Sequence, residues 1–294
     1  ETGTTISGGL YGVKLDAGGP YTIDNAGEIS AGTALNTLSY GIFVLSPVTV
    51  TSINNTPTGV IKANLTAGIA YGIYGNGGSI GTLINAGLIS GIGGGGDFAF
   101  GIGITLISNN IETITNSGTI TASAGNAYGI HVEIGSTVDT ITNSGTITAS
   151  AGVDTAYGIY VSNNSTVGTI TNSGTITVSA VESNAYGIFV NTTSSVGTIT
   201  NSGTITASAG DKTAYGIFVD VDSTVDTITN SGTITASADT ANAFGIHVSD
   251  TSTVGTITNS GTITASVGVD NAYGIHLDTN VSVGTLTNSG TITA

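Results

Sequence analysis

Apolar and polar residues alternate in short segments along the whole chain. In a regular stretch, Thr140–Asn143 and Gly145–Ala149 each place an Ile between Thr residues, and Tyr157–Val161 places Tyr, Ile and Val at every second position. Residues of these types favour strands, and no 3.6-residue period appears. We therefore expect three short strands in such a stretch. The Ile residues should face the core and the Thr residues solvent, with Tyr157 facing inward and Tyr160 outward.

The same pattern repeats along the chain. The eleven residues from Thr140 recur almost unchanged at Thr113, Thr169, Thr198, Thr227 and Thr256, and Tyr-Gly-Ile recurs between the copies. Marking each unit by the Asn of its Asn-Ser-Gly or related turn gives ten units, spaced by 30, 30, 31 and 27 residues and then five times by 29. A fixed period of this size is typical of solenoid proteins.

One unit cannot bury its apolar face alone, whereas stacked units bury it as a continuous column. We therefore predict an all-β fold: a right-handed parallel β-helix (β-solenoid) with three strands per coil and about ten coils of ~29 residues, each rising by about 4.8 Å. Residues 1–294 should form a single solenoid domain, with irregular repeats in 1–112 and near-identical repeats in 113–294.

The Asn of each turn has the parity of the buried Ile. We expect its amide to bond both the turn backbone and the Asn one coil away, and we expect the Asn and the following Gly to adopt left-handed conformations. A residue repeated in every unit is interpreted as structural rather than as a binding site. In the regular part of the chain this Asn ladder comprises Asn116, Asn143, Asn172, Asn201, Asn230, Asn259 and Asn288.

The position after the Ile of the third strand is the most informative candidate site. It carries large side chains and has outward parity, so we expect an exposed stripe that makes lateral contacts, unless a loop covers it. Lys14 and Gly103 interrupt this stripe, whose members are Phe43, Tyr74, His131, Tyr160, Phe189, Phe218, His247 and His276.

The composition restricts the chemistry. There are 18 acidic and three basic residues, for a net charge of −15, and the three lysines are scattered. Nucleic acid is therefore excluded as a partner, and an anionic membrane surface is disfavoured. The chain has no Cys, which removes disulfides and thiolate chemistry. No apolar run reaches the roughly 20 residues that span a bilayer, so the chain should not span a membrane.

No cofactor or metal site is predicted. Metal ligation by the His residues is disfavoured, with His247 and His276, which lie on neighbouring rungs without an aromatic rung between them, as the one exception left open. The densest acidic patch is Asp220, Asp222 and Asp226, which lacks the spacing of an EF-hand loop. We interpret it as a solvated loop, with Ca²⁺ binding as the alternative.

The two ends of the chain resemble strands of the repeat. The Gly-Thr-Ile-Thr type of segment occurs eleven times, whereas the other two types occur ten times, so one terminal strand is surplus to complete coils. We expect this surplus strand to serve end-to-end association into an open homopolymer. The predicted contact residues are Thr4, Thr5, Ile6, Thr291, Ile292 and Thr293.

Runs of Thr-Ile-Thr-Asn-Ser-Gly-Thr-Ile that alternate with Tyr-Gly-Ile resemble the passenger regions of bacterial autotransporters and related surface β-helix adhesins. The resemblance covers the whole chain. It implies a secreted or surface-displayed protein whose other partners would be host or cell-surface glycans or proteins.

These observations favour a non-enzymatic extracellular structural protein that assembles end to end into a filament or forms a surface adhesin stalk. Three alternatives remain open. The chain could be an excised, monomeric passenger segment of an autotransporter adhesin, or an ice-binding solenoid that uses its Thr ladders. It could also be a polysaccharide-active β-helix enzyme, although no pair of carboxylates is marked in the repeats.

Overall fold

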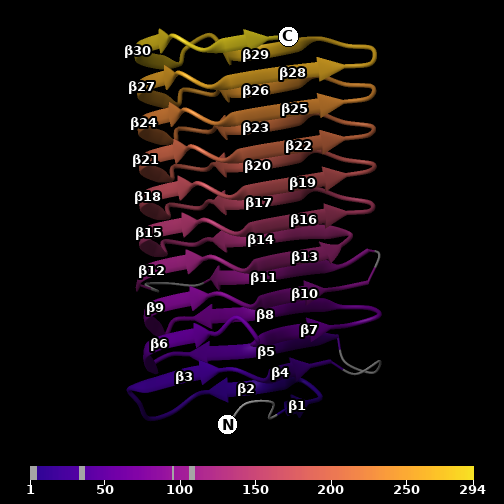
Figure 1. Ribbon diagram of the computed structural model, residues 1–294, viewed down its shortest axis with the longest axis vertical. Helices are drawn as coiled ribbons and strands as arrows, with labels where there is room; N and C mark the ends of the chain where they lie inside the picture. The colour runs from indigo at the N-terminus through magenta and orange to yellow at the C-terminus, as the bar shows by residue number, and fades with distance from the viewer. Residues whose placement is uncertain (1–4, 33–36, 95, 106–109) are drawn as a thin grey trace.

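The computed structural model describes residues 5–32, 37–94, 96–105 and 110–294 of the chain. In this part of the chain all regular structure is β: thirty-one strands form three parallel sheets that stack coil upon coil into a rod (Figure 1). The predicted all-β solenoid with three strands per coil is confirmed. Its right-handed winding stays a prediction. None of the described residues belongs to a helix able to cross a bilayer.

Sheet A has eleven strands and contains the surplus strand that the segment count predicted. Its members, in order along the rod, are β1 (Thr5–Gly8), β4 (Glu28–Ala31), β7 (Val60–Asn64), β10 (Leu88–Ile92), β13 (Thr119–Ala124), β16 (Thr146–Ala151), β19 (Thr175–Ala180), β22 (Thr204–Ala209), β25 (Thr233–Ala238), β28 (Thr262–Val267) and β31 (Thr291–Thr293).

Sheet B has ten strands and contains the Tyr-Gly-Ile segments. Its members are β2 (Tyr11–Leu15), β5 (Leu38–Leu45), β8 (Ile69–Asn76), β11 (Phe98–Thr105), β14 (Asn126–Val132), β17 (Ala156–Val161), β20 (Ala185–Val190), β23 (Ala214–Val219), β26 (Ala243–Val248) and β29 (Ala272–Leu277).

Sheet C also has ten strands, and each of them ends at the Asn of a turn. Its members are β3 (Tyr21–Asn25), β6 (Thr49–Asn55), β9 (Ser79–Asn85), β12 (Asn110–Asn116), β15 (Thr137–Asn143), β18 (Thr166–Asn172), β21 (Ser195–Asn201), β24 (Thr224–Asn230), β27 (Thr253–Asn259) and β30 (Ser282–Asn288).

Equivalent residues of successive coils pair with each other. Ile141 of β15, for example, pairs with Ile170 of β18. These Ile side chains are fully buried and belong to one apolar cluster that runs through the rod, whereas the flanking Thr140 is half-buried. The predicted inward Ile and outward Thr positions are therefore confirmed in sheets A and C.

The sheet C strands begin earlier than predicted. Strand β15 begins at Thr137 rather than at Thr140. Val138 is therefore a second buried apolar residue of this strand, and its equivalents are buried in the sheet C strands β18, β21, β24 and β27. The register between β15 and β18 passes over Asp139, so the strand has a local irregularity there and Val138 and Ile141 both face inward although they are three residues apart. Strict alternation does not predict this.

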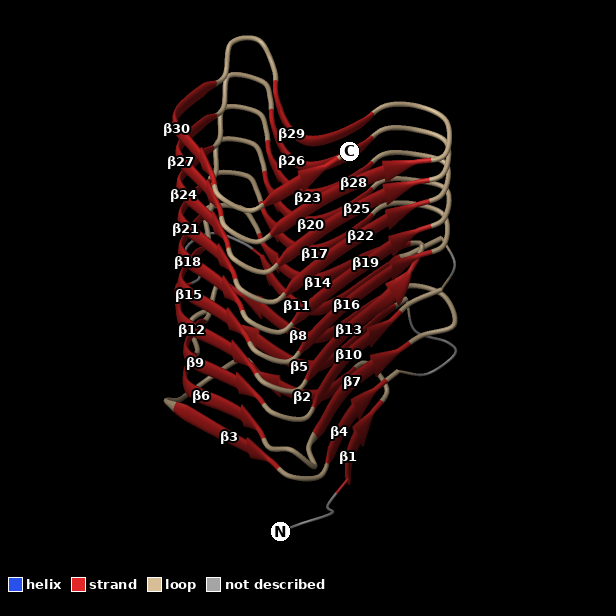
Figure 2. Cartoon of the chain, turned by 45° about the horizontal axis from the view of Figure 1, so that its top comes forward, coloured by secondary structure: helices blue, strands red, loops and turns tan. Residues whose placement is uncertain are grey.

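Sheet B departs from simple alternation at its glycine. The register passes over Gly158, and the strands of the sheet are bent there, with the concave side turned away from the core (Figure 2). A Cβ on Gly158 would lie 2.5 Å from both the carbonyl oxygen of Gly187 and Cγ2 of Ile176, so only glycine fits. Because of the bend, Tyr157 and Tyr160 both point outward and Ile159 points inward. The inward assignment of Tyr157 was wrong.

The conformation of the loops also differs from prediction. Neither Asn143 nor Gly145 has a positive φ; Gly145 is required because a Cβ would lie 2.1 Å from the carbonyl oxygen of Gly118. The non-glycine residues with positive φ lie instead in the loops between sheets B and C, as Asn163 and Asn164 show with φ of 56° and 62°.

Candidate functional site

The outer face of sheet B carries two columns of aromatic rings. One column is the tyrosine column, formed by the first residue of each Tyr-Gly-Ile segment or its equivalent, and the other is the stripe identified in the sequence. Within one coil the ring centroids of Tyr157 and Tyr160 are 4.6 Å apart. Between coils the Tyr157–Tyr186 and Tyr160–Phe189 centroids are 5.1 and 5.2 Å apart, with nearly parallel planes. The rings therefore stack along the rod and also across the two columns.

The stripe is not exposed, so this prediction was wrong. Phe189 and Phe218 are 5% and 6% exposed, and Phe43, Tyr74, His131 and His247 are buried to a similar degree. Tyr160 and His276 are half-buried. The cause is the bend at the glycine, which turns the tyrosine column toward the stripe in the concave face, so that each column covers the other. The lateral contact role assigned to the stripe loses the exposed surface on which it depended.

Burial also governs the chemistry of the tyrosine hydroxyls. It raises the pKa of Tyr40 and of Tyr215 to about 12, because ionisation would place a charge in a poorly solvated environment. Stacked aromatic pairs are worth about 0.5–1.5 kcal/mol beyond their buried area. The hydroxyls of Tyr40 and Tyr215 are therefore neutral, and the stacked rings contribute to the cohesion of the rod.

The Asn side chains at the ends of the sheet C strands form a continuous hydrogen-bonded ladder. Nδ2 of Asn172 donates to Oδ1 of Asn201 at 2.8 Å, and it also donates to the carbonyl oxygens of Gly174 and Thr204. The same side-chain bond links successive coils from Asn25 to Asn288. The side chain of the Asn at each turn therefore joins its own coil to the neighbouring coil by hydrogen bonds.

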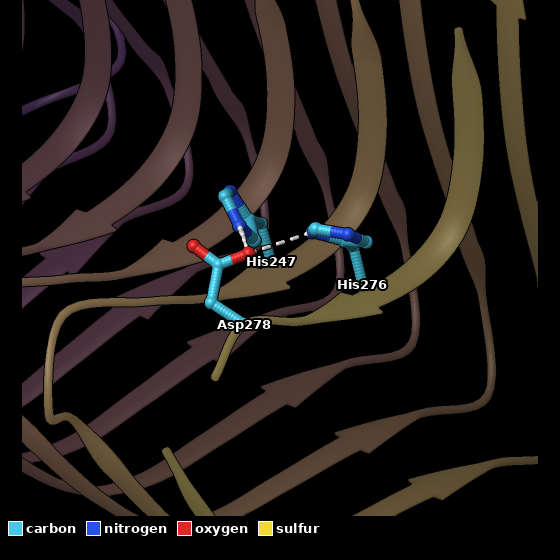
Figure 3. A group of neighbouring side chains, drawn as sticks. All are labelled: His247, His276 and Asp278. Atoms are coloured by element: carbon cyan, nitrogen blue, oxygen red, sulfur yellow. Dashed lines mark ion pairs between the residues drawn. The ribbon is translucent and has the colours of Figure 1, made fainter. Parts of the chain in front are cut away.

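Three ligand-type side chains meet near the last coils of sheet B (Figure 3). His247 lies on β26, His276 lies one coil further on β29, and Asp278 follows β29 directly. Oδ1 of Asp278 lies 3.3 Å from Nε2 of His247 and 3.2 Å from Nδ1 of His276. All three ligand atoms lie within 4.8 Å of one another, and this is the one such group of three among the described residues.

Sequence reasoning considered the two His residues but missed Asp278. The available signal was its spacing. Residues 29 apart occupy neighbouring rungs, and Asp278 is two residues beyond His276 in sequence. Asp278 was not considered because the stripe was assigned to an exposed face, where a nearby carboxylate would have no particular partner. Burial lowers the pKa of His247, which keeps its imidazole neutral.

The acidic patch does not form a cation site of three converging ligands. Asp220 accepts a hydrogen bond from Ser249, and Asp222 accepts one from Thr251, both from residues one coil further along the rod. Asp226 lies exposed on β24. Two of the three acids therefore join neighbouring loops and the third lies on a strand, while the choice between a solvated patch and a Ca²⁺ site stays a prediction.

The two end coils expose parts of the core. Thr4 lies outside the described residues; Thr5 and Ile6 of β1 are exposed, as are Thr291, Ile292 and Thr293 of β31. Ile6 is 46% exposed and Ile292 36%, whereas the equivalent Ile29 is only 3% exposed. A hollow of about 450 Å³ opens at the first coil between Ile6, Val13, Ile23 and Ile29. Apolar core positions are thus accessible at both ends of the described rod.

Comparisons with known proteins do not add a family. No match was found to any family model, to any curated protein or to any solved structure.

Proposed function

We propose that the protein is a non-enzymatic structural rod of the extracellular or cell-surface space, which stacks end to end as a filament or as the stalk of a surface adhesin. The observation that carries the proposal is that each coil of the described rod pairs with the next through equivalent residues, so that the first described coil of one copy matches the last described coil of another. Exposed apolar surface and unpaired strand edges both favour association with a matching surface.

The order of the sheets defines how two copies fit. In the chain a sheet C strand is always followed by a sheet A strand, and β31 occupies the sheet A position after β30. The sheet B strand that would complete the same coil is the equivalent of β2, which belongs to the start of a second copy. The β31 strand would then take the place of β1 in that copy, with Ile292 above Ile29. The junction between two copies therefore contains a single sheet A position. Either β31 of one copy or β1 of the other copy occupies it.

The experiment is a set of deletions examined by electron microscopy and sedimentation. The chain should form unbranched fibres in a concentration-dependent manner. Deletion of 1–8 or of 290–294 alone should leave fibres, because the other copy of the strand fills the shared position. Deletion of both segments should reduce fibre formation strongly. A chain that stays monomeric at high concentration would refute the end-to-end proposal.

The location at the cell surface rests on the resemblance of the repeats to autotransporter passengers and surface adhesins. An antibody raised against the rod should label intact source cells or their medium without permeabilisation. Labelling that requires permeabilised cells would argue against this part of the proposal.

The Thr ladders support a second candidate, ice binding. Thr140 and Thr142 pair with Thr169 and Thr171 in neighbouring coils of sheet C, so two parallel rows of Thr follow the outer face of that sheet. A regular two-dimensional array of hydroxyl and methyl groups is the feature that this function would use. Thermal hysteresis of the purified protein tests it, and freezing behaviour equal to that of a control protein would dismiss it.

A further inference from the structure

We propose that His247, His276 and Asp278 form a binding site for a borderline divalent transition-metal ion, of which Zn²⁺ is the representative. This site is built entirely from residues of one chain. It lies in the concave face of sheet B, where the stripe reaches its last two rungs (Figure 3).

Two of the three distances between the ligand atoms match a metal centre, and the third lies within 4.8 Å. Zn²⁺ binds His nitrogen and carboxylate oxygen at about 2.0–2.2 Å in tetrahedral geometry, which places ligand atoms about 3.3–3.5 Å apart. The two separations from Asp278 Oδ1, 3.3 Å to His247 and 3.2 Å to His276, lie close to this range. Imidazole nitrogen together with one carboxylate oxygen suits Zn²⁺ and its neighbours in the transition series better than Ca²⁺ or Mg²⁺.

The orientation of the rings provides a second observation. Elsewhere along the stripe neighbouring rings are nearly parallel, as the Phe189–Phe218 interplanar angle of 5° shows. The His276 ring is instead tilted by 51° from His247 and by 46° from Tyr273. With this tilt the His276 ring does not stack face to face with its neighbours. Its Nδ1 instead lies 3.2 Å from Oδ1 of Asp278.

The buried nitrogen atoms provide a third observation. The side chain of His247 is only 9% exposed, and its Nδ1 has no hydrogen-bond partner. Nε2 of His247 and Nδ1 of His276 both face the carboxylate of Asp278, so a metal ion between the three groups would bind one nitrogen of each ring.

A hollow beside His276 and Asp278 leaves room for a further ligand. It measures about 370 Å³ and is bordered by His276, Asp278, Asp250 and Thr251. Three protein ligands with an accessible fourth position form the arrangement in which Zn²⁺ can hold water or an added donor.

His131 is the matched control. It occupies the same position in the stripe, is buried, and lies 3.2 Å from the carboxylate of Glu133. Its neighbours in the stripe are Gly103 and Tyr160, so no second imidazole is available. His131 tests whether one buried His–carboxylate pair is sufficient for binding.

The test is titration of the full chain with Zn²⁺ by isothermal calorimetry, and with Co²⁺ by visible absorption, which reports tetrahedral coordination. Phe already stands at this position in other coils, so His247→Phe and His276→Phe preserve the stacking, and Asp278→Asn preserves the shape of the carboxylate. We expect one ion per chain, at least tenfold weaker binding in each of these variants, and affinity within about twofold of the original in His131→Phe. Circular dichroism verifies that the variants are folded.

Two outcomes would overturn the site. One is a wild-type chain that binds no stoichiometric Zn²⁺. The other is binding that is retained in folded His247→Phe and His276→Phe, which would assign the ion to surface carboxylates.

Discussion

The Asn ladder offers the most direct test of how the coils are held together. Asn201 is fully buried and makes four hydrogen bonds through its side chain. Its Nδ2 donates to Oδ1 of Asn230 at 2.8 Å and to the carbonyl oxygens of Thr233 and Gly203, and its Oδ1 accepts a bond of 2.8 Å from Asn172. We predict that replacement of Asn201 by Ala strongly destabilises the rod.

The magnitude follows from these contacts. A hydrogen bond contributes about 0.5–1.5 kcal/mol net, and a buried acceptor left without its donor costs about 1–3 kcal/mol. Removing four bonds, and leaving Oδ1 of Asn230 without the donor from Asn201, should therefore lower the free energy of unfolding by about 3–9 kcal/mol. Asn201→Leu fills the space but satisfies none of the polar groups, so it should destabilise the rod by a similar amount.

The assay is urea unfolding followed by far-UV circular dichroism, combined with hydrogen exchange measured by mass spectrometry. Because each coil contacts only its neighbours, exchange should accelerate in the coils around Asn201 and remain unchanged near Asn259. Thr200→Ala, at the adjacent half-buried position, is the control and should change stability by no more than about 0.5 kcal/mol. An Asn201→Leu rod as stable as the original would refute the reasoning, since apolar filling would then be sufficient.

Four further predictions concern the core, the stripe, the loops and pH. Ile170→Ala should cost about 2–5 kcal/mol in urea unfolding, whereas Thr169→Ala should stay near 0.5 kcal/mol; the reverse order would contradict the assigned faces. Phe189→Ala should lower the free energy of unfolding by about 3–5 kcal/mol because the ring is buried in the stack; an unchanged free energy of unfolding would contradict this burial. Val221 has a φ of 48°, which disfavours a β-branched residue, so Val221→Asn should raise stability by about 1 kcal/mol; a loss would show that its side-chain contacts outweigh the strain. Burial lowers the pKa of His131 from 6.5 to about 3, so below pH 6.5 the unfolded chain binds a proton that the folded chain does not; stability should fall from pH 6.5 toward 3, and less so in His131→Phe.

The sequence was sufficient to predict the solenoid because the 29-residue period and the alternation of Ile and Thr act together. Ile141 and Ile170 could be placed in the core, and paired with each other, before any coordinates were considered. The parity of Tyr157 could not be predicted in the same way. It depends on a bend at Gly158, and a glycine within a strand does not state by itself in which direction the strand bends.

The third member of the candidate metal site, Asp278, was missed for the same reason. On a solvated face, the side chains of His247 and His276 would be exposed to water. Asp278 would then be one of many acidic residues in the loops. The bend converts this face into a concave, largely covered one, where a carboxylate beside two imidazoles has consequences. The register of the repeats is sufficient to predict that the two His residues are neighbours. Their burial depends on the bend of the sheet B strands, which the sequence does not predict.

One feature of the coils bears on how such a chain changes in evolution. The coil between Asn116 and Asn143 is two residues shorter than the regular ones, yet its strands pair in the same register, because the shortening lies between β13 and β14. Removing residues 202–230 would join Asn201 to Ser231 and recreate the Asn-Ser-Gly turn. The rod would lose one rung of about 4.8 Å and would keep equivalent interfaces on both sides of the junction. Misaligned recombination between near-identical gene repeats would therefore produce folded proteins of different lengths, and length can vary in whole-coil steps without invention of a new interface.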